Sequence, residues 1–154
     1  MKKLTAFLLV CVMMLGLCSC GEEVPGIGDT ATIEDVEIKF IGVETVTEPA
    51  MTPAEGKVFI LCEFEVTNHT GKDLGISTML NFKVHCDGNA CNISLGALMS
   101  KGAKSQLDGT IGPNRKLQGV VGYEVPADWK ELEIDYTTSI VDDAKLTFVA
   151  KNNG

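Results

Sequence analysis

Apolar and polar residues alternate along most of this chain, and that alternation restricts its fold more than any other feature. In the run from Gly56 to Asn68 every second residue from position 58 to 66 is apolar. These residues are Val58, Ile60, Cys62, Phe64 and Val66. Successive side chains of a β-strand point to opposite faces, so a period of two predicts a strand with one buried face. Phe59 and Leu61 add two apolar groups to the opposite face, which is otherwise polar.

Comparable runs recur along the chain, separated by turn-forming residues. They cover residues 36–46, 80–86, 91–93, 117–125, 132–136 and 146–150. A bulge or change of face is expected near Gly42, a hairpin turn from Asp87 to Ala90, and at most a helical turn between Ser94 and Lys104. Seven or eight short strands predict an all-β antiparallel sandwich of two sheets, with a closed barrel as the alternative. No internal repeat indicates a propeller or solenoid.

Residues 1–19 have the organisation of a secretory signal peptide. Two lysines precede an apolar run from Leu4 to Leu17, and small residues follow it. A transmembrane helix needs about 20 apolar residues, and this run is shorter and contains Gly16. We therefore expect an export signal that is removed, and a membrane-spanning anchor is the less favoured alternative.

The end of this segment resembles the lipobox of bacterial lipoproteins. Leu17, Cys18 and Ser19 stand before Cys20 as a Leu and two small residues. The resemblance implies that Cys20 becomes a lipidated N-terminus and attaches the protein to a membrane. Cys18 competes for the same role, but the bulky Leu17 precedes it, so Cys20 fits the pattern better. Each buried methylene of an acyl chain contributes about 0.8 kcal/mol, and two or three chains would hold the protein on the membrane.

Removal of residues 1–19 leaves 135 residues, which is a usual size for one domain. The turn-rich segment 20–28 is expected to be a tether and residues 29–154 the folded domain. The mature chain has 11 basic and 21 acidic residues, a net charge of −10. Nucleic acids and anionic lipid headgroups both attract basic surfaces, so this charge argues against either as a docking partner.

Several ordered segments resemble a family of bacterial lipoprotein domains of unknown function. The resemblance rests on 28–44, on a Gly-Lys-Val-Phe strand that ends in Thr67-Asn68, and on Gly112-Pro113 followed by 119–126. Together these segments extend from about Gly28 to Ala150. The family has sometimes been called, misleadingly, telomeric repeat-binding factor 2. The resemblance implies an immunoglobulin-like sandwich, as in small secreted immunoprotective antigens, and it implies no activity and no ligand residues.

Catalytic and metal-binding patterns are weak in this sequence. His69 lies in a turn by composition, and His85 is expected on the polar face of its strand with no nucleophile placed beside it. A zinc site usually needs four ligands, and Cys86 and Cys91 have no second cysteine pair to complete one. We therefore expect no enzyme activity, no metal and no cofactor.

Three cysteines remain after the lipidation site. Cys86 and Cys91 flank the predicted turn, so a cross-strand disulfide between them is a candidate in an exported protein. Two alternatives stay open, namely that all the thiols are reduced or that Cys62 takes part in a bond. Cys62 itself lies in an apolar face and is expected to be a small core residue.

Four residues are candidates for a contact surface. Phe59 and Leu61 lie on the outward face of their strand, where a partner or the protein's own chain must cover them. Met51 lies in a proline-containing loop, and Trp129 lies at a corner, where it either anchors a partner or plugs the core.

These features predict an exported, lipid-anchored accessory module that binds an envelope protein, a peptide or a glycan. The alternative is a structural or protective envelope protein, such as a spacer or an inhibitor, that has no dedicated ligand. Composition does not separate these two functions.

Overall fold

The computed structural model describes residues 23–102, 104–138 and 144–152. Cys20 and the signal segment lie outside the described residues. In the described part, the chain forms ten strands and two short helices. They are β1 (Thr30–Ile33), β2 (Val36–Thr45), β3 (Lys57–Asn68), β4 (Leu74–Ile76), α1 (Thr78–Asn81), β5 (Phe82–Cys86), β6 (Asn89–Cys91), α2 (Leu95–Met99), β7 (Gly109–Ile111), β8 (Arg115–Pro126), β9 (Glu131–Tyr136) and β10 (Leu146–Lys151).

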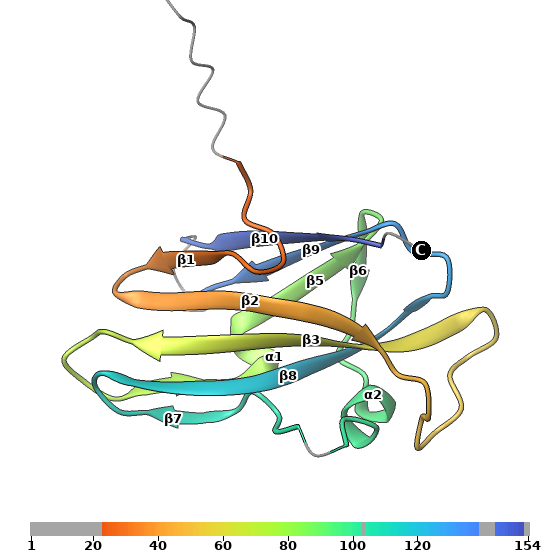
Figure 1. The fold of residues 1–154 in the computed structure, drawn as a ribbon, viewed down its shortest axis with the longest axis horizontal. Coiled ribbons are helices and arrows are strands. Elements are labelled where there is room, and N and C mark those ends of the chain that lie inside the picture. Colours follow the sequence, from red (N-terminus) through yellow and green to blue (C-terminus); the bar gives the residue numbers. More distant parts are fainter. Residues whose placement is uncertain (1–22, 103, 139–143, 153–154) are drawn as a thin grey trace, which may run out of the picture.

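Two four-stranded antiparallel sheets pack face to face, which confirms the predicted sandwich (Figure 1). One sheet has the order β1-β2-β3-β8 and the other β10-β9-β5-β6. Strands β4 and β7 form a separate two-stranded sheet. The predicted change of face in β2 is also confirmed, because Phe40 pairs with Phe64 while Gly42 pairs with Glu63, so that one residue is bulged.

The core lies between the inner faces of the two sheets. Aromatic rings form its centre, where Phe40 stacks on Phe64 at 4.7 Å between ring centroids and Phe148 packs edge-on against both rings. Cys62 is fully buried in this core, as its apolar face predicted. Trp129 is only 5% exposed and belongs to the same cluster, so it plugs the core.

A second, smaller apolar cluster lies on the outer face of the β1-β2-β3-β8 sheet. Phe59 and Leu61 are 4% and 3% exposed there and pack with Ala97 of α2 and with Val120 of β8. The helix lies against Phe59 so closely that a Cβ atom on Gly96 would come within 2.5 Å of the ring. Phe59 and Leu61 are therefore covered by the protein's own chain and are not an exposed contact surface.

One of the two helices was expected from the sequence and the other was not. Helix α2 lies within the segment 94–104, where a helical turn was expected. Helix α1 was not expected, since Leu80 was assigned to the inward face of a strand that continued through Phe82. In the structure Leu80 belongs to α1 and is 58% exposed, and the strand begins only at Phe82. The alternation is interrupted there because the Asn81 carboxamide oxygen accepts a hydrogen bond from the Ser77 amide and closes a local turn.

The folded domain begins four residues earlier than the sequence predicted. The Val149 amide donates to the Pro25 carbonyl oxygen at 2.9 Å, and the Gly28 amide donates to the Phe40 carbonyl oxygen at 2.7 Å. Residues 25–28 are thus fixed to β10 and β2 and do not act as a free tether. This segment enters at the β1 and β10 edge of the sandwich (Figure 1).

Candidate functional site

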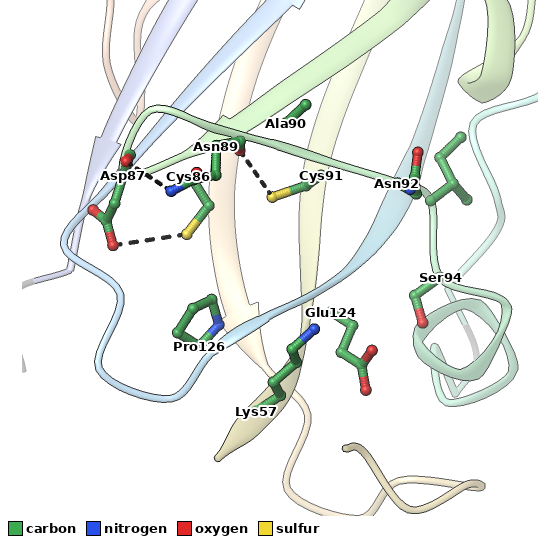
Figure 2. A pocket seen from close by; sticks show the side chains of 11 residues that line it. Lys57, Cys86, Asp87, Asn89, Ala90, Cys91, Asn92, Ser94, Glu124 and Pro126 are labelled. Atoms are coloured by element: carbon green, nitrogen blue, oxygen red, sulfur yellow. Dashed lines mark hydrogen bonds between the residues drawn. The ribbon is translucent and has the colours of Figure 1, made fainter. Parts of the chain in front are cut away.

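A cavity of about 530 Å³ opens at the edge of the sandwich opposite the entering chain. Figure 2 shows the β5–β6 hairpin on one side of it and the ends of β3 and β8 on the other. The lining residues are Lys57, Cys86, Asp87, Asn89, Ala90, Cys91, Asn92, Ile93, Ser94, Glu124 and Pro126. The strand orders place β6 and β8 three strands away from β10 and β1, a separation of about 14 Å at 4.8 Å per strand.

The hairpin turn at the cavity mouth is built by Asp87 and Gly88. Both residues have positive φ, 49° and 77°, as a tight two-residue hairpin turn with the right twist requires. The Asp87 carboxylate accepts hydrogen bonds from the Lys130 and Glu131 amides at 2.9 to 3.2 Å, which ties the turn to the start of β9. Asp87 therefore positions the wall of the cavity, and the predicted turn is confirmed.

Cys86 and Cys91 both lie on this wall, and both are free thiols in the structure. The register pairs Cys86 with Asn89 and Cys91 with Val84, so the two cysteines are diagonal neighbours on one face. Diagonal positions have Cα atoms about 7–8 Å apart, beyond the 4.4–6.8 Å that disulfides usually span. The structure therefore does not form the predicted disulfide, because the cysteines flank the turn without lying opposite each other.

The protonation of these thiols follows from their surroundings. Burial, with smaller contributions from the Cys91 and Asp87 side chains, raises the pKa of Cys86 to about 12. Burial also raises the pKa of Cys91, although hydrogen bonds with Cys86 oppose that rise. Both groups are consequently thiols at neutral pH, and thiols are poor nucleophiles and poor metal ligands. Protonated Cys86 and Cys91 therefore fit a cavity that binds a ligand without forming a covalent bond to it.

The opposite wall carries two charged groups of unlike sign. Lys57 pairs with Pro126, and Phe59 pairs with Glu124, so the Lys57 and Glu124 side chains leave the same face of the sheet. One Glu124 carboxylate oxygen accepts a hydrogen bond of 2.8 Å from the Ala54 amide, which holds the β2–β3 loop near the cavity. The other carboxylate oxygen and the Lys57 amine supply an acceptor and a donor for a polar ligand.

A second cavity of about 430 Å³ shares the segment from Ala90 to Ile93 with the first. Its other lining residues are Met79, Phe82, Lys83, Val84, His85 and Tyr123. The Tyr123 hydroxyl is buried and makes no hydrogen bond to any residue that the structure describes. Burial, with smaller contributions from Cys62 and Cys91, raises the Tyr123 pKa, so the hydroxyl keeps its proton and can donate it.

The sequence-predicted contact residues are dispersed in the structure. Met51 is 50% exposed in the β2–β3 loop, whereas Phe59, Leu61 and Trp129 are buried. Of the two possibilities for Trp129, the structure supports the core plug, because the residue is buried in the main core cluster. Lys57, Glu124 and Tyr123 were not singled out from the sequence. In the sequence, Lys57 and Glu124 were marked only by their position near the ends of predicted strands. That position indicates a site only when it is known that the edges of the two sheets meet there.

The described residues form neither a metal-binding cluster nor a membrane-spanning helix. No three His, Cys, Asp or Glu side chains in that part of the chain are grouped so as to hold a metal ion. Neither of its helices has the length and apolar character that crossing a membrane requires.

Comparison with known proteins identifies similar domains. A family model described as a domain of unknown function, DUF4352, matches residues 25–146, and its description contains no reference to telomeric repeats. No curated protein matches the chain.

Solved structures share the fold at low sequence identity. The Bacillus subtilis ycdA protein, described as "a putative lipoprotein", has 14% identity and a TM-score of 0.68 over 81% of this chain. This chain spans only 39% of that protein. The yjhA protein of the same organism has 14% identity and a TM-score of 0.65, covering 81% of this chain and 98% of its own. An uncharacterized β-sandwich protein from Clostridium difficile has 15% identity and a TM-score of 0.52, covering 84% and 94%.

Proposed function

We propose that this chain, which belongs to the DUF4352 family of domains of unknown function, is a lipid-anchored, non-enzymatic binding module on the outer side of a membrane. Cys20 carries the lipid, and the two adjoining cavities at the β6 and β8 edge hold a segment of an envelope protein or a peptide. The structural similarity to ycdA, a protein described as "a putative lipoprotein", is in keeping with the anchored location.

The observation that carries this proposal is the placement of the cavities relative to the entering chain. Residues 25–28 attach to β10 and β2, whereas the cavities are lined by β5, β6 and β8 at the other edge. A lipid at Cys20 would therefore hold one edge of the sandwich near the membrane and leave the cavities facing away from it. Such an arrangement suits a module that presents a binding site to the envelope.

The chemistry of the cavities favours an amphipathic segment as the ligand. The second cavity offers apolar side chains such as Phe82 and Val84, and the first offers the Lys57 amine and the Glu124 carboxylate. A buried hydroxyl without a partner costs free energy, so a ligand acceptor that reached Tyr123 would add affinity. A few polar groups beside apolar side chains are typical of ligand sites.

Site-specific photocrosslinking in cells tests the proposal. A photoreactive amino acid at Asn92, which lines both cavities, should capture a discrete partner. The matched control is the same amino acid at Lys72, an exposed residue beyond the opposite end of β3. Ala90→Trp, which fills the shared wall, should abolish the Asn92 product, and Cys20→Ala should remove it by releasing the protein from the membrane.

The outcomes separate the proposal from its alternative. A product captured from Asn92 and not from Lys72 supports the binding module. Equal products from both positions, or none from Asn92 in the anchored protein, would overturn it in favour of a spacer or protective protein. Retention of the Asn92 product in the Ala90→Trp protein would show that the partner does not use the cavities.

A further inference from the structure

The three segments that form the edge where the chain enters the sandwich carry little charge of their own. They are residues 24–28, strand β1 and strand β10, which contain no acidic residue and only one basic residue, Lys151. The whole chain carries 21 acidic residues, so their absence from these three segments is marked. Acidic residues border these segments: Asp29, whose carboxylate accepts a 2.8 Å hydrogen bond from the Gly26 amide, lies between residues 24–28 and β1, and Glu34 and Asp35 follow β1.

Two exposed apolar side chains flank the entry point. Val24 and Ile27 are 52% and 50% exposed, on either side of Pro25 and Gly26. The Val149 amide fixes Pro25 to β10, and a Cβ on Gly26 would lie 3.4 Å from the Val149 carbonyl oxygen. Ile27 therefore lies between attached residues of the domain, and Val24 directly precedes the attached Pro25.

The length of chain before Pro25 limits how far this edge can lie from a lipid. Cys20 and Pro25 are five residue steps apart, which span at most about 17 Å when fully extended. Glu22 and Glu23 belong to the segment between Cys20 and Pro25, so they stay near the lipid whichever face of the domain turns toward the membrane. They therefore do not select an orientation, whereas the composition of the nearby edge does.

We propose that the weakly charged edge formed by residues 24–28, β1 and β10 lies against the lipid headgroups of the membrane, with Val24 and Ile27 at the boundary with the acyl chains. The inference rests on the lipidation of Cys20 in the proposed function. An uncharged surface loses less hydration energy than a charged one when it enters the interface, and buried apolar area adds to the attachment. Acidic faces of a chain with net charge −10 would be repelled by anionic lipids, which favours the same orientation.

Quenching by brominated lipids tests this orientation in the full lipidated protein. The native protein and its Ile27→Trp and Leu95→Trp variants are reconstituted in vesicles of phosphatidylethanolamine and phosphatidylglycerol with bromine near the headgroup end of the acyl chains. Leu95 is the matched control, because it is 69% exposed on α2 at the distant edge. Trp129 is buried and supplies a constant baseline. The tryptophan at position 27 should lose most of its emission, and the one at position 95 should lose almost none.

Vesicle flotation and the mass of the N-terminal peptide test the lipidation of Cys20 separately from the orientation of the domain. A protein that carries no acyl group and does not float would overturn both the proposed function and this orientation. A lipidated protein that floats but shows no quenching at position 27, or equal quenching at both positions, would overturn the orientation alone. Amide exchange in the native protein provides a check without substitution, since vesicles should slow exchange in β1 and leave α2 unchanged.

Discussion

Gly119 provides the sharpest test of how the sandwich edge beside the cavities is closed. A Cβ atom at this position would lie 2.8 Å from the Leu107 nitrogen and 2.9 Å from both the Leu107 Cα and the Gln106 carbonyl carbon. All three atoms belong to backbone, so they cannot turn aside as the end of a side chain could. Gly119→Ala must therefore push the segment around Leu107 away from β8.

The cost can be worked out from the contacts of that segment. Leu107 is fully buried, its amide donates to the Val120 carbonyl oxygen at 3.1 Å, and the Val120 amide donates to the Ser105 carbonyl oxygen at 2.9 Å. Overpacking costs about 1–3 kcal/mol, and each weakened backbone hydrogen bond adds up to about 1 kcal/mol. We expect Gly119→Ala to lower the free energy of unfolding by about 2–4 kcal/mol.

Urea unfolding followed by Trp129 fluorescence and circular dichroism measures this loss. With a slope of about 2 kcal/mol per molar urea, the midpoint should fall by roughly 1–2 M. Gly75→Ala in β4 is the matched control, because no atom lies within 4 Å of its Cβ position. That variant should change the free energy of unfolding by less than about 1 kcal/mol. A Gly119→Ala protein as stable as the native one would refute the closely packed edge.

Three further predictions concern the hairpin, the thiols and the outer face. Asp87→Ala should speed hydrogen exchange of the Lys130 and Glu131 amides and lower stability by about 1–3 kcal/mol, since both amides lose their acceptor, while unchanged exchange would contradict the tie. Cys86 should resist alkylation of the folded protein at pH 7, and a disulfide with Cys91 found by mass spectrometry would contradict the diagonal register. Hydrogen bonds from Gln118 and Lys104 lower the Glu63 pKa below its ordinary 4.5, so this contribution to stability is present above pH 4.5 and is lost as the pH falls. Glu63→Gln should flatten that part of the pH dependence, although solvent screening keeps the effect small.

Sequence periodicity was sufficient for the inner faces of the long strands β2, β3 and β8, whereas the short strands β1, β4 and β7 were not predicted, so the structure has ten strands where seven or eight were expected. The alternation in β3 and β8 predicts which residues enter the core, and the structure buries Ile60, Phe64 and Val121 as expected. The hairpin turn at Asp87 and the bulge at Gly42 were equally accessible, since turn residues and breaks in period are local signals. Such features depend on neighbours in the chain, and the sequence contains those directly.

The candidate site could not be predicted in the same way, because its parts come from separate strands. Lys57, Asn92 and Glu124 meet only because β3, β6 and β8 end at one edge of the sandwich. The same limit applies to Phe59, whose exposure depended on whether α2 folds back over it. A contact between two distant segments leaves no periodic trace in either one.

The sequence by itself therefore determined the long strands, their apolar inner faces, the bulge near Gly42 and the turn at Asp87. Tertiary structure alone decided that Trp129 is buried, that Cys86 and Cys91 lie diagonally, and that the chain enters at the edge opposite the cavities. The physical reason is that alternation specifies which face of a strand avoids water, while strand order and register depend on the packing of the two sheets together.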